Sequence, residues 1–148
     1  MKRYIKTAVA DVNAEEYDVH HSIASDPNTR PDVLRHLVDL YTDGRPGEPV
    51  LYAVAQNPNT PEDCLARLMD IHNYTLTLNL VWNPNLPSSL LDKLADRYPK
   101  YGENIVSYIL EHPNTDIQTM LKIYDNYDYS EDVQDTARVA LRRKGYNI

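Results

Sequence analysis

The stretch that decides the fold is Val54-Ala55-Gln56-Asn57-Pro58-Asn59-Thr60-Pro61, because it contains a turn that recurs along the chain. The turn at 57–60 is repeated at 26–29, 83–86 and 112–115, and its proline stands at positions 27, 58, 84 and 113. A sequence period of roughly 20–50 residues is typical of solenoids and other repeat arrays. We therefore expect four copies of one structural unit.

Each copy has the pattern of a helix, a tight turn and a second helix. Apolar residues recur at helical spacing before the turn and again after it, as at Val54 and Leu65. The proline ends the first helix because it lacks an N–H group and restricts the residue before it. The threonine of each turn is predicted to cap the second helix, in a capping box with the residue three positions later. These pairs are Thr29 with Asp32, Thr60 with Asp63, and Thr115 with Gln118.

The two ends of the chain differ from the repeats. At the C-terminal end, a capping helix is predicted over about 130–144, with Ser130 as its N-cap and Gly145 as its stop. Its Val139-Ala140 aligns with Val54-Ala55, which makes it the first helix of an incomplete fifth copy. Near the N-terminal end, Asp11 or Asn13 is expected to cap a helix that runs to about Ala24. Residues 1–10 fit either a partial helix or a frayed arm.

Together these patterns predict one all-α domain over residues 1–148. We expect a right-handed α-solenoid of about four helix–turn–helix repeats with a C-terminal capping helix. One such repeat is too small to bury its own apolar face, so the stacking of neighbours has to supply the core.

The Val-Ala-x-Asn-Pro-Asn-Thr-Pro core, clearest at 54–61, resembles the leucine-rich repeat variant family and, more broadly, HEAT-like α-solenoids of bacteria and their phages. The resemblance covers about residues 19–127 plus the capping helix and implies a binding scaffold. The family's repeats are shorter and pair an α-helix with a 3₁₀ helix, whereas this period has room for two α-helices. Its best known member holds an iron–sulfur centre on a cysteine cluster; this chain has only Cys64, so no cofactor is expected.

Composition argues against several classes of function. The chain has 22 acidic and 15 basic residues, a formal charge of -7, which disfavours binding to nucleic-acid phosphates. No apolar run approaches the roughly 20 residues of a membrane span. The basic start is followed by too short an apolar run, at 7–10, for a signal peptide. With a single cysteine, these features indicate a cytoplasmic protein.

No arrangement of residues in the sequence matches a catalytic or metal-binding motif. Adjacent helical residues such as His20 and His21 point about 100° apart and do not readily share an ion. His20 falls in an apolar column and is predicted to be structural, and Cys64 is predicted to be a small buried hydrophobe. We therefore expect no enzyme activity and no metal.

Two polar columns repeat along the chain and are predicted to be structural. The four asparagines that follow the repeat prolines fit amides that bond the turn backbone, with a partner-binding edge as the alternative: Asn28, Asn59, Asn85 and Asn114. A basic column on the second helices fits a solvated face, with a groove for nucleic acid as the alternative: His36, Arg67, Lys93 and Lys122.

The candidate binding residues are aromatic and acidic. Trp82 stands in a column that is otherwise polar, which favours a partly exposed ring of the kind common at binding hot spots. The loop tyrosines Tyr74, Tyr101 and Tyr129 are further candidate anchors, whereas ring packing is favoured for the helix-end column Tyr41, His72, Tyr98 and Tyr127. Segment 103–135 holds eight acids and one base, from which we select for steering Glu111, Asp128, Glu131 and Asp132. The loop at 42–49 is a further candidate contact.

The sequence thus predicts a non-catalytic protein–protein interaction module, a small intracellular adaptor or inhibitor of bacterial or phage type. Its partner is expected to be a protein, with a basic protein as one candidate class, and no small-molecule substrate or membrane is expected. The alternatives are an acidic mimic of nucleic acid that occupies a nucleic-acid-binding protein, and a HEAT-like protein that itself binds nucleic acid.

Overall fold

The structure is a computed structural model that describes residues 14–42, 47–97 and 102–148, and these ranges contain helices and no strands. The predicted all-α class is therefore confirmed. The chain divides into two compact units, residues 1–83 and 84–148, which are described separately. Residues 1–10, the candidate caps Asp11 and Asn13, positions 43–46 of the loop, Tyr98 and Tyr101 lie outside the described residues. The prediction of a single domain stays a prediction.

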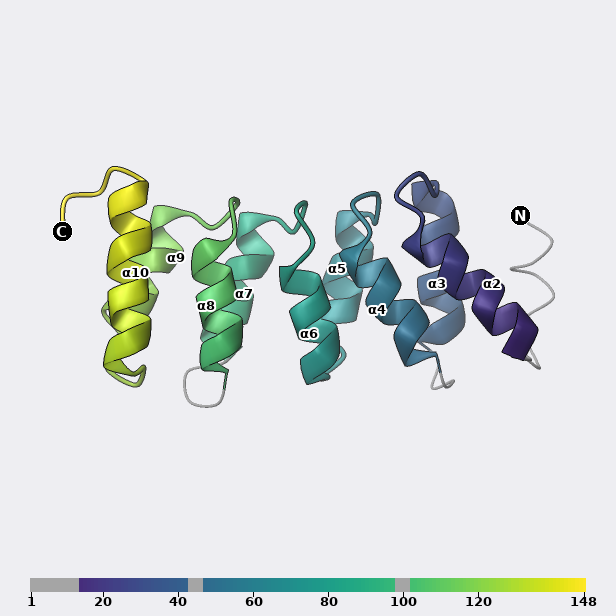
Figure 1. The fold of residues 1–148 in the computed structure, drawn as a ribbon, viewed down its shortest axis with the longest axis horizontal. Helices are drawn as coiled ribbons and strands as arrows, with labels where there is room; N and C mark the ends of the chain where they lie inside the picture. The colour runs from purple at the N-terminus through teal and green to yellow at the C-terminus, as the bar shows by residue number, and fades with distance from the viewer. Residues whose placement is uncertain (1–13, 43–46, 98–101) are drawn as a thin grey trace. The chain divides into compact units, whose positions relative to one another are not determined.

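The first unit contains five helices within the described ranges, arranged in two layers (Figure 1). One layer consists of α2 (Ala14–Ser25), α4 (Glu48–Gln56) and α6 (Tyr74–Val81), and α4 packs against both of its neighbours. The other layer consists of α3 (Pro31–Tyr41) and α5 (Glu62–Met69), which contact each other and the helices of the first layer. The chain alternates between the layers because each Pro-Asn turn reverses its direction.

The second unit repeats this arrangement with four helices in its described part (Figure 1). Helices α8 (Glu103–Glu111) and α10 (Glu131–Arg143) form one layer, and α7 (Ser88–Arg97) and α9 (Ile117–Tyr124) form the other. Helix α10 packs against both α8 and α9, so it covers the C-terminal end of this unit's core.

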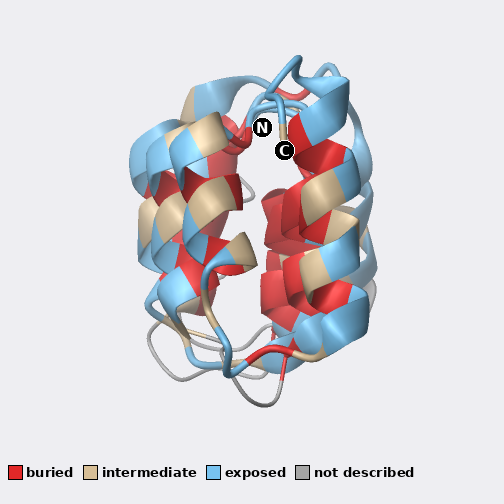
Figure 2. Ribbon diagram, turned by 90° about the vertical axis from the view of Figure 1, so that its left-hand side faces the viewer, coloured by how far each residue is buried: buried red, intermediate tan, exposed pale blue. Residues whose placement is uncertain are grey.

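The core of each unit lies where the apolar faces of the two layers meet. Figure 2 shows the buried residues on the sides of helices that pack against neighbours, with exposed residues on the opposite sides. The leucine columns of the second helices are fully buried, as predicted: Leu34, Leu37, Leu65, Leu68, Leu91 and Leu94. Their burial supplies the main favourable term of folding, about 1.5–3 kcal/mol for each such side chain.

The turns are held together by side-chain amides that reach the preceding turn. The Asn57 amide donates to the carbonyls of Ala24 and Asp26 at 2.8 and 2.7 Å, and the Asn83 amide does the same to Ala55 and Asn57. Both asparagines are buried. The Asn57 side-chain oxygen also accepts from the Asn59 N–H at 2.9 Å, which fixes its own turn. One side chain thus makes three hydrogen bonds and links two repeats.

The asparagines after the prolines form a second set of links. Asn59 donates to the carbonyls of Pro27 and Thr29 in the first unit, and Asn114 donates to those of Pro84 and Leu86 in the second. The predicted structural role of this column is confirmed for these two members.

The predicted threonine caps are wrong. The hydroxyls of Thr29, Thr60 and Thr115 donate to carbonyls six residues earlier, on Ile23, Val54 and Ile109. They therefore satisfy the last carbonyls of the first helix and do not accept from the N–H groups of the second. The N-caps of the second helices are the next residues, Arg30, Pro61 and Asp116, of which only Asp116 accepts a capping bond, from the Thr119 N–H.

A fifth turn with the same backbone pattern lies at 126–129 and has no proline. Asn126 accepts from the Asp128 N–H with its side chain and from the Tyr129 N–H with its carbonyl, as Asn57 does for Asn59 and Thr60. Tyr129 occupies the threonine position of this turn. Its ring is buried, and its hydroxyl donates to the Ala95 carbonyl at 2.9 Å. Burial raises the pKa of Tyr129. The expected exposed anchor at Tyr129 is therefore wrong.

The capping helix begins and ends as predicted, and its buried positions are shifted by one residue from those of α4. Ser130 accepts from the Val133 N–H, and Gly145 follows the helix with a φ of 83° that favours glycine. Ala140 and Leu141 are buried where Val54 and Ala55 are buried in α4, whereas Val139 is 46% exposed. The Lys144 ammonium donates to the Pro113 carbonyl at 3.3 Å, the role that the Asn114 amide has at Pro84.

Candidate protein-binding surface

The described residues bring together no group of three or more potential metal ligands, and none of their helices is long and apolar enough to cross a bilayer. Cys64 is buried, and desolvation by burial raises the pKa of its thiol, which disfavours the reactive thiolate. His20 is also fully buried, and its Nδ1 lies 2.7 Å from the Tyr41 hydroxyl. Both residues have the structural positions that the sequence predicts.

The first helix of each repeat presents one stripe of side chains at positions i, i+4 and i+8. These positions lie above one another on a helix and face away from the buried columns. In the first unit the stripes are Tyr17–His21–Ser25 on α2, Glu48–Tyr52–Gln56 on α4 and Tyr74–Leu78–Trp82 on α6; in the second unit, Glu103–Ser107–Glu111 lies on α8. Every member is half-buried or exposed.

The stripe on α6, which we call the α6 stripe, is the most apolar of the four. Tyr74 is 46% exposed and Trp82 is 49% exposed, with the half-buried Leu78 between them. Trp82 is the C-cap of this helix, and its backbone N–H donates to the Leu78 carbonyl. The expected partial exposure of Trp82 and Tyr74 is confirmed. Large rings exposed together in this way are typical of protein-binding surfaces.

A groove of about 400 Å³ lies beside this stripe in the first unit. Its lining is mostly polar and uncharged, and comes from α2, α4, α6 and the turn after α4: His21, Ser25, Pro49, Tyr52, Ala53, Gln56, Asn57, Pro58 and Asn79. We call it the unit 1 groove. The Gln56 amide donates to the Asn79 side-chain oxygen, and the Tyr52 hydroxyl donates to Glu48 at 3.1 Å. Sequence reasoning missed this groove, although one asparagine in the otherwise apolar Leu78-Asn79-Leu80 was a signal for it.

The second unit has a smaller pocket in the corresponding layer, of about 240 Å³ between α8 and α10. Its lining combines both charges with small and apolar groups: Leu110, Glu111, Asp135, Thr136, Val139, Ala140 and Arg143. Of the predicted steering residues, Glu111 lies here, whereas Asp128, Glu131 and Asp132 are exposed around the start of α10. Acidic groups at a helix N-terminus are stabilised by its dipole, so these last two also have a structural reason to be acidic.

The helix-end column divides between the core and the surface. Tyr41 is buried against His20 and packs edge-on to its ring, as predicted. His72 is exposed, and Tyr127 is 91% exposed at the tip of the 126–129 turn, which contradicts ring packing there. The Asn-Tyr-Asp spacing at 126–128 was the missed signal for this turn.

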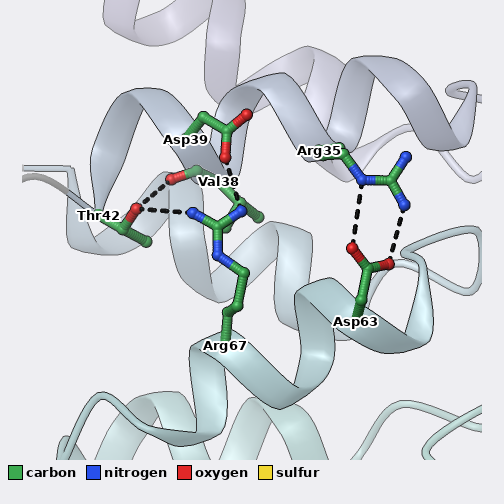
Figure 3. Close-up of polar contacts among 6 residues, drawn as sticks. All are labelled: Arg35, Val38, Asp39, Thr42, Asp63 and Arg67. Atoms are coloured by element: carbon green, nitrogen blue, oxygen red, sulfur yellow. Dashed lines mark hydrogen bonds and ion pairs between the residues drawn. The ribbon is translucent and has the colours of Figure 1, made fainter.

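Two members of the basic column, Arg67 and Lys122, form ion pairs between second helices. In the first unit, Arg67 on α5 pairs with Asp39 on α3 at 2.6 Å (Figure 3). A second arginine, Arg35 on α3, donates two hydrogen bonds to Asp63 on α5, and these bonds lower the pKa of Asp63. In the second unit, Lys122 lies 2.6 Å from Asp92 and 2.9 Å from Asp96. Arg67 and Lys122 therefore have acidic partners within the protein, so the structure shows no bare basic groove along them.

Searches of protein-family models, curated proteins and solved structures found no match to this chain.

Proposed function

We propose that this chain is a non-catalytic, protein-binding adaptor or inhibitor of the cytoplasm. In this proposal, about four helix–turn–helix repeats form a right-handed α-solenoid similar to those of the leucine-rich repeat variant and HEAT-like classes. The inter-turn hydrogen bonds of Asn57, Asn59 and Asn114 support the repeat architecture, since they join each turn to the one before it.

The observation that carries the proposed function is the α6 stripe. Tyr74 and Trp82 place two half-exposed rings on one face of one helix, and neither ring contributes to the buried core. Burying an aromatic side chain of this size at an interface contributes a large apolar area at a low entropy cost. Acids of the second unit, of which Glu111, Asp128, Glu131 and Asp132 are exposed, would speed the approach of a basic protein.

The acidic segment favours protein binding over mimicry of nucleic acid. Three of its eight acids have roles inside the second unit: Asp116 caps α9, Glu103 accepts from the Ser130 N–H, and Asp135 pairs with Arg138. A mimic of a phosphate backbone needs a regular row of free charges, and these three are already engaged.

The test uses the full chain as bait in an extract of its source cells, followed by quantitative mass spectrometry. We expect at least one protein to be captured by the wild type and reduced by about tenfold or more by Trp82→Ala, the loss that is typical of a hot spot. Tyr127→Ala is the matched control, because it removes a more exposed ring from the second unit. Equal capture by wild type and Trp82→Ala would refute the proposal.

Trp82 is the single tryptophan of the chain, so its fluorescence reports on this surface alone. Titration with the purified partner should shift the emission to shorter wavelength, because the half-exposed indole leaves water. Tyr127→Ala should give the same shift, whereas Tyr74→Ala should require more partner to reach it.

A further inference from the structure

The layer of α2, α4 and α6 contains no lysine and no arginine, although the first unit has both charges elsewhere. The basic side chains of its second helices, Arg35 and Arg67, lie in the other layer and are paired with Asp63 and Asp39. The charges that the first layer does present are acidic. Asp18 and Glu48 are exposed, and neither has a cationic partner among the described residues.

These two acids lie close to residues that line the unit 1 groove, and both act electrostatically on Tyr17. Asp18 is one turn before the groove residue His21 on the same side of α2, and Glu48 accepts the hydrogen bond of the groove residue Tyr52. A cation at the end of the groove that His21 and Tyr52 line would therefore be attracted by both carboxylates, in a region without a basic group on these three helices.

The groove also offers neutral hydrogen-bonding groups. The Ser25 hydroxyl has no hydrogen-bond partner in the described part of the chain, and the Gln56 amide uses one N–H, toward Asn79, which leaves its carbonyl oxygen as an acceptor. Serine and amide side chains both donate and accept, so they can pair with the N–H and C=O groups of a polypeptide backbone. A folded helix has these groups satisfied internally, whereas an extended chain offers them.

Trp82 adds an aromatic face next to these polar groups. It lies three residues after Asn79, on the adjacent turn of the same side of α6, and half of its surface is exposed. The face of an indole ring attracts lysine and arginine side chains by cation–π interaction.

From these observations we infer that the unit 1 groove, with Asp18, Glu48 and Trp82 at its margins, binds an extended basic segment of a polypeptide. Packed helices lie about 8–10 Å apart, so the path from α2 to α6 measures roughly 18 Å and takes about six extended residues. The inference names the partner class of the proposed function and rests on that function.

The experiment measures fluorescence anisotropy of three labelled eight-residue peptides with the full-length protein. Their sequences are Lys-Leu-Lys-Ala, Ser-Leu-Ser-Ala and Glu-Leu-Glu-Ala, each repeated twice, so they share apolar content and differ in charge. The test variant is Asp18→Asn with Glu48→Gln. The control is Glu62→Gln with Asp70→Asn, which removes two exposed charges from α5 and its C-cap in the other layer.

We expect the basic peptide to bind at least about fivefold more tightly than the neutral one, and the acidic peptide to bind weakest. The Asp18→Asn/Glu48→Gln variant should weaken the basic peptide by about five- to tenfold, and the α5 control by less than about twofold. Trp82→Ala should also weaken it, and the circular dichroism melting curve of each variant checks that the fold is intact.

Equal binding of the three peptides, binding of none, or equal losses in the two charge variants would overturn the inference. Capture of a natural partner that depends on Trp82 but not on Asp18 and Glu48 would also overturn it, while leaving the proposed function in place. If capture does not depend on Trp82 at all, it is the proposed function that fails.

Discussion

The two units use the same turn chemistry but differ in the surface of the layer that carries their grooves. In the first unit, α2, α4 and α6 have no lysine or arginine; in the second, α10 alone has three arginines, at positions 138, 142 and 143. The inter-turn bonds of Asn59 and Asn114 are nevertheless equivalent. The comparison shows that the buried turn positions are constrained by hydrogen bonding, whereas the exposed stripes are free to diverge.

The residue before the proline shows how far that constraint extends. Asn57 donates two bonds to the preceding turn and accepts one in its own, whereas Asp26 in the first copy accepts one bond, from the Asn28 N–H. In the second unit, His112 Nδ1 accepts the equivalent bond from the Asn114 N–H. All three side chains thus accept a hydrogen bond from a backbone N–H of their own turn. The amide of Asn57 also donates to the preceding repeat, and this makes Asn57 a link between repeats.

The largest expected effect comes from Asn57→Ala. It leaves the carbonyls of the buried Ala24 and of Asp26 without this donor, which should lower the free energy of unfolding by about 2–4 kcal/mol in urea denaturation. Asn57→Asp should cost at least as much although it keeps the acceptor, because it removes both donors and buries a carboxylate against two carbonyl oxygens. Asp26→Ala should cost about 1 kcal/mol or less. Similar losses for Asn57→Ala and Asp26→Ala would refute the distinction between linking and local turn residues.

A second comparison concerns glycines, which the two units require for different reasons. A Cβ on Gly47 would lie 1.8 Å from Cδ1 of the buried Tyr41 ring, whereas a Cβ on Gly145 would meet nothing, although its φ is 83°. Gly47→Ala should therefore cost about 2–3 kcal/mol by overpacking, and Gly145→Ala about 1 kcal/mol through its backbone. Thermal unfolding measures both. Gly145→Asn should lose less stability than Gly145→Ala, because asparagine tolerates a positive φ. Equal losses in these two variants would argue against a backbone origin of the effect.

Much of the fold could be predicted from the sequence because the same pattern of residues recurs in several copies. The leucine columns, the ends of α10 and the burial of Cys64 follow from spacing alone. The threonines were misassigned because a hydroxyl can accept at a helix start or donate at a helix end, and the sequence pattern is the same for both. Tyr129 was misassigned because its turn has no proline, so its alignment with Thr60 was not visible.

The candidate surface was less predictable for a physical reason. Trp82 stood out because its column is otherwise polar, but the unit 1 groove depends on which side chains of α2, α4 and α6 become neighbours. Gln56 and Asn79 are 23 residues apart and meet only after the helices pack. Ion pairs such as Arg35–Asp63 likewise depend on the contact between α3 and α5 of neighbouring repeats, which no local pattern specifies.

A smaller effect is expected from pH, and it belongs to the first unit. Burial lowers the pKa of His20, with Glu16 acting in the opposite direction, and its Nε2 has no hydrogen-bond partner in the described structure. Below the unfolded-state pKa of about 6.5, the unfolded chain binds more protons than the folded chain, so stability should fall by up to about 1.4 kcal/mol per pH unit. Above that pH the contribution should be constant.

Urea denaturation between about pH 7.5 and pH 5 isolates the contribution of His20 to stability. Carboxylates with lowered pKa values, such as Asp63 and Asp92, stay charged over this range. His20→Leu should flatten the pH dependence even if its overall stability is lower. His72→Gln, at an exposed position, should keep the wild-type slope. An unchanged slope in His20→Leu would show that another group is responsible.

The smallest expected effect compares the ion pairs of the two units. Lys122 bridges Asp92 and Asp96, which are four residues apart on α7, whereas Arg35 pairs with Asp63 alone. These side chains are 38–65% exposed, so each pair is worth about 0.2–1 kcal/mol. Lys122→Met should cost more than Arg35→Met, because it also leaves two like charges at adjacent turns of one helix.

The difference between the two variants should shrink in about 1 M NaCl, where screening acts over about 3 Å. It should also shrink in Lys122→Met with Asp96→Asn, since that double variant removes the repulsion. A difference that persists in salt would instead assign the effect of Lys122 to the packing of its aliphatic chain.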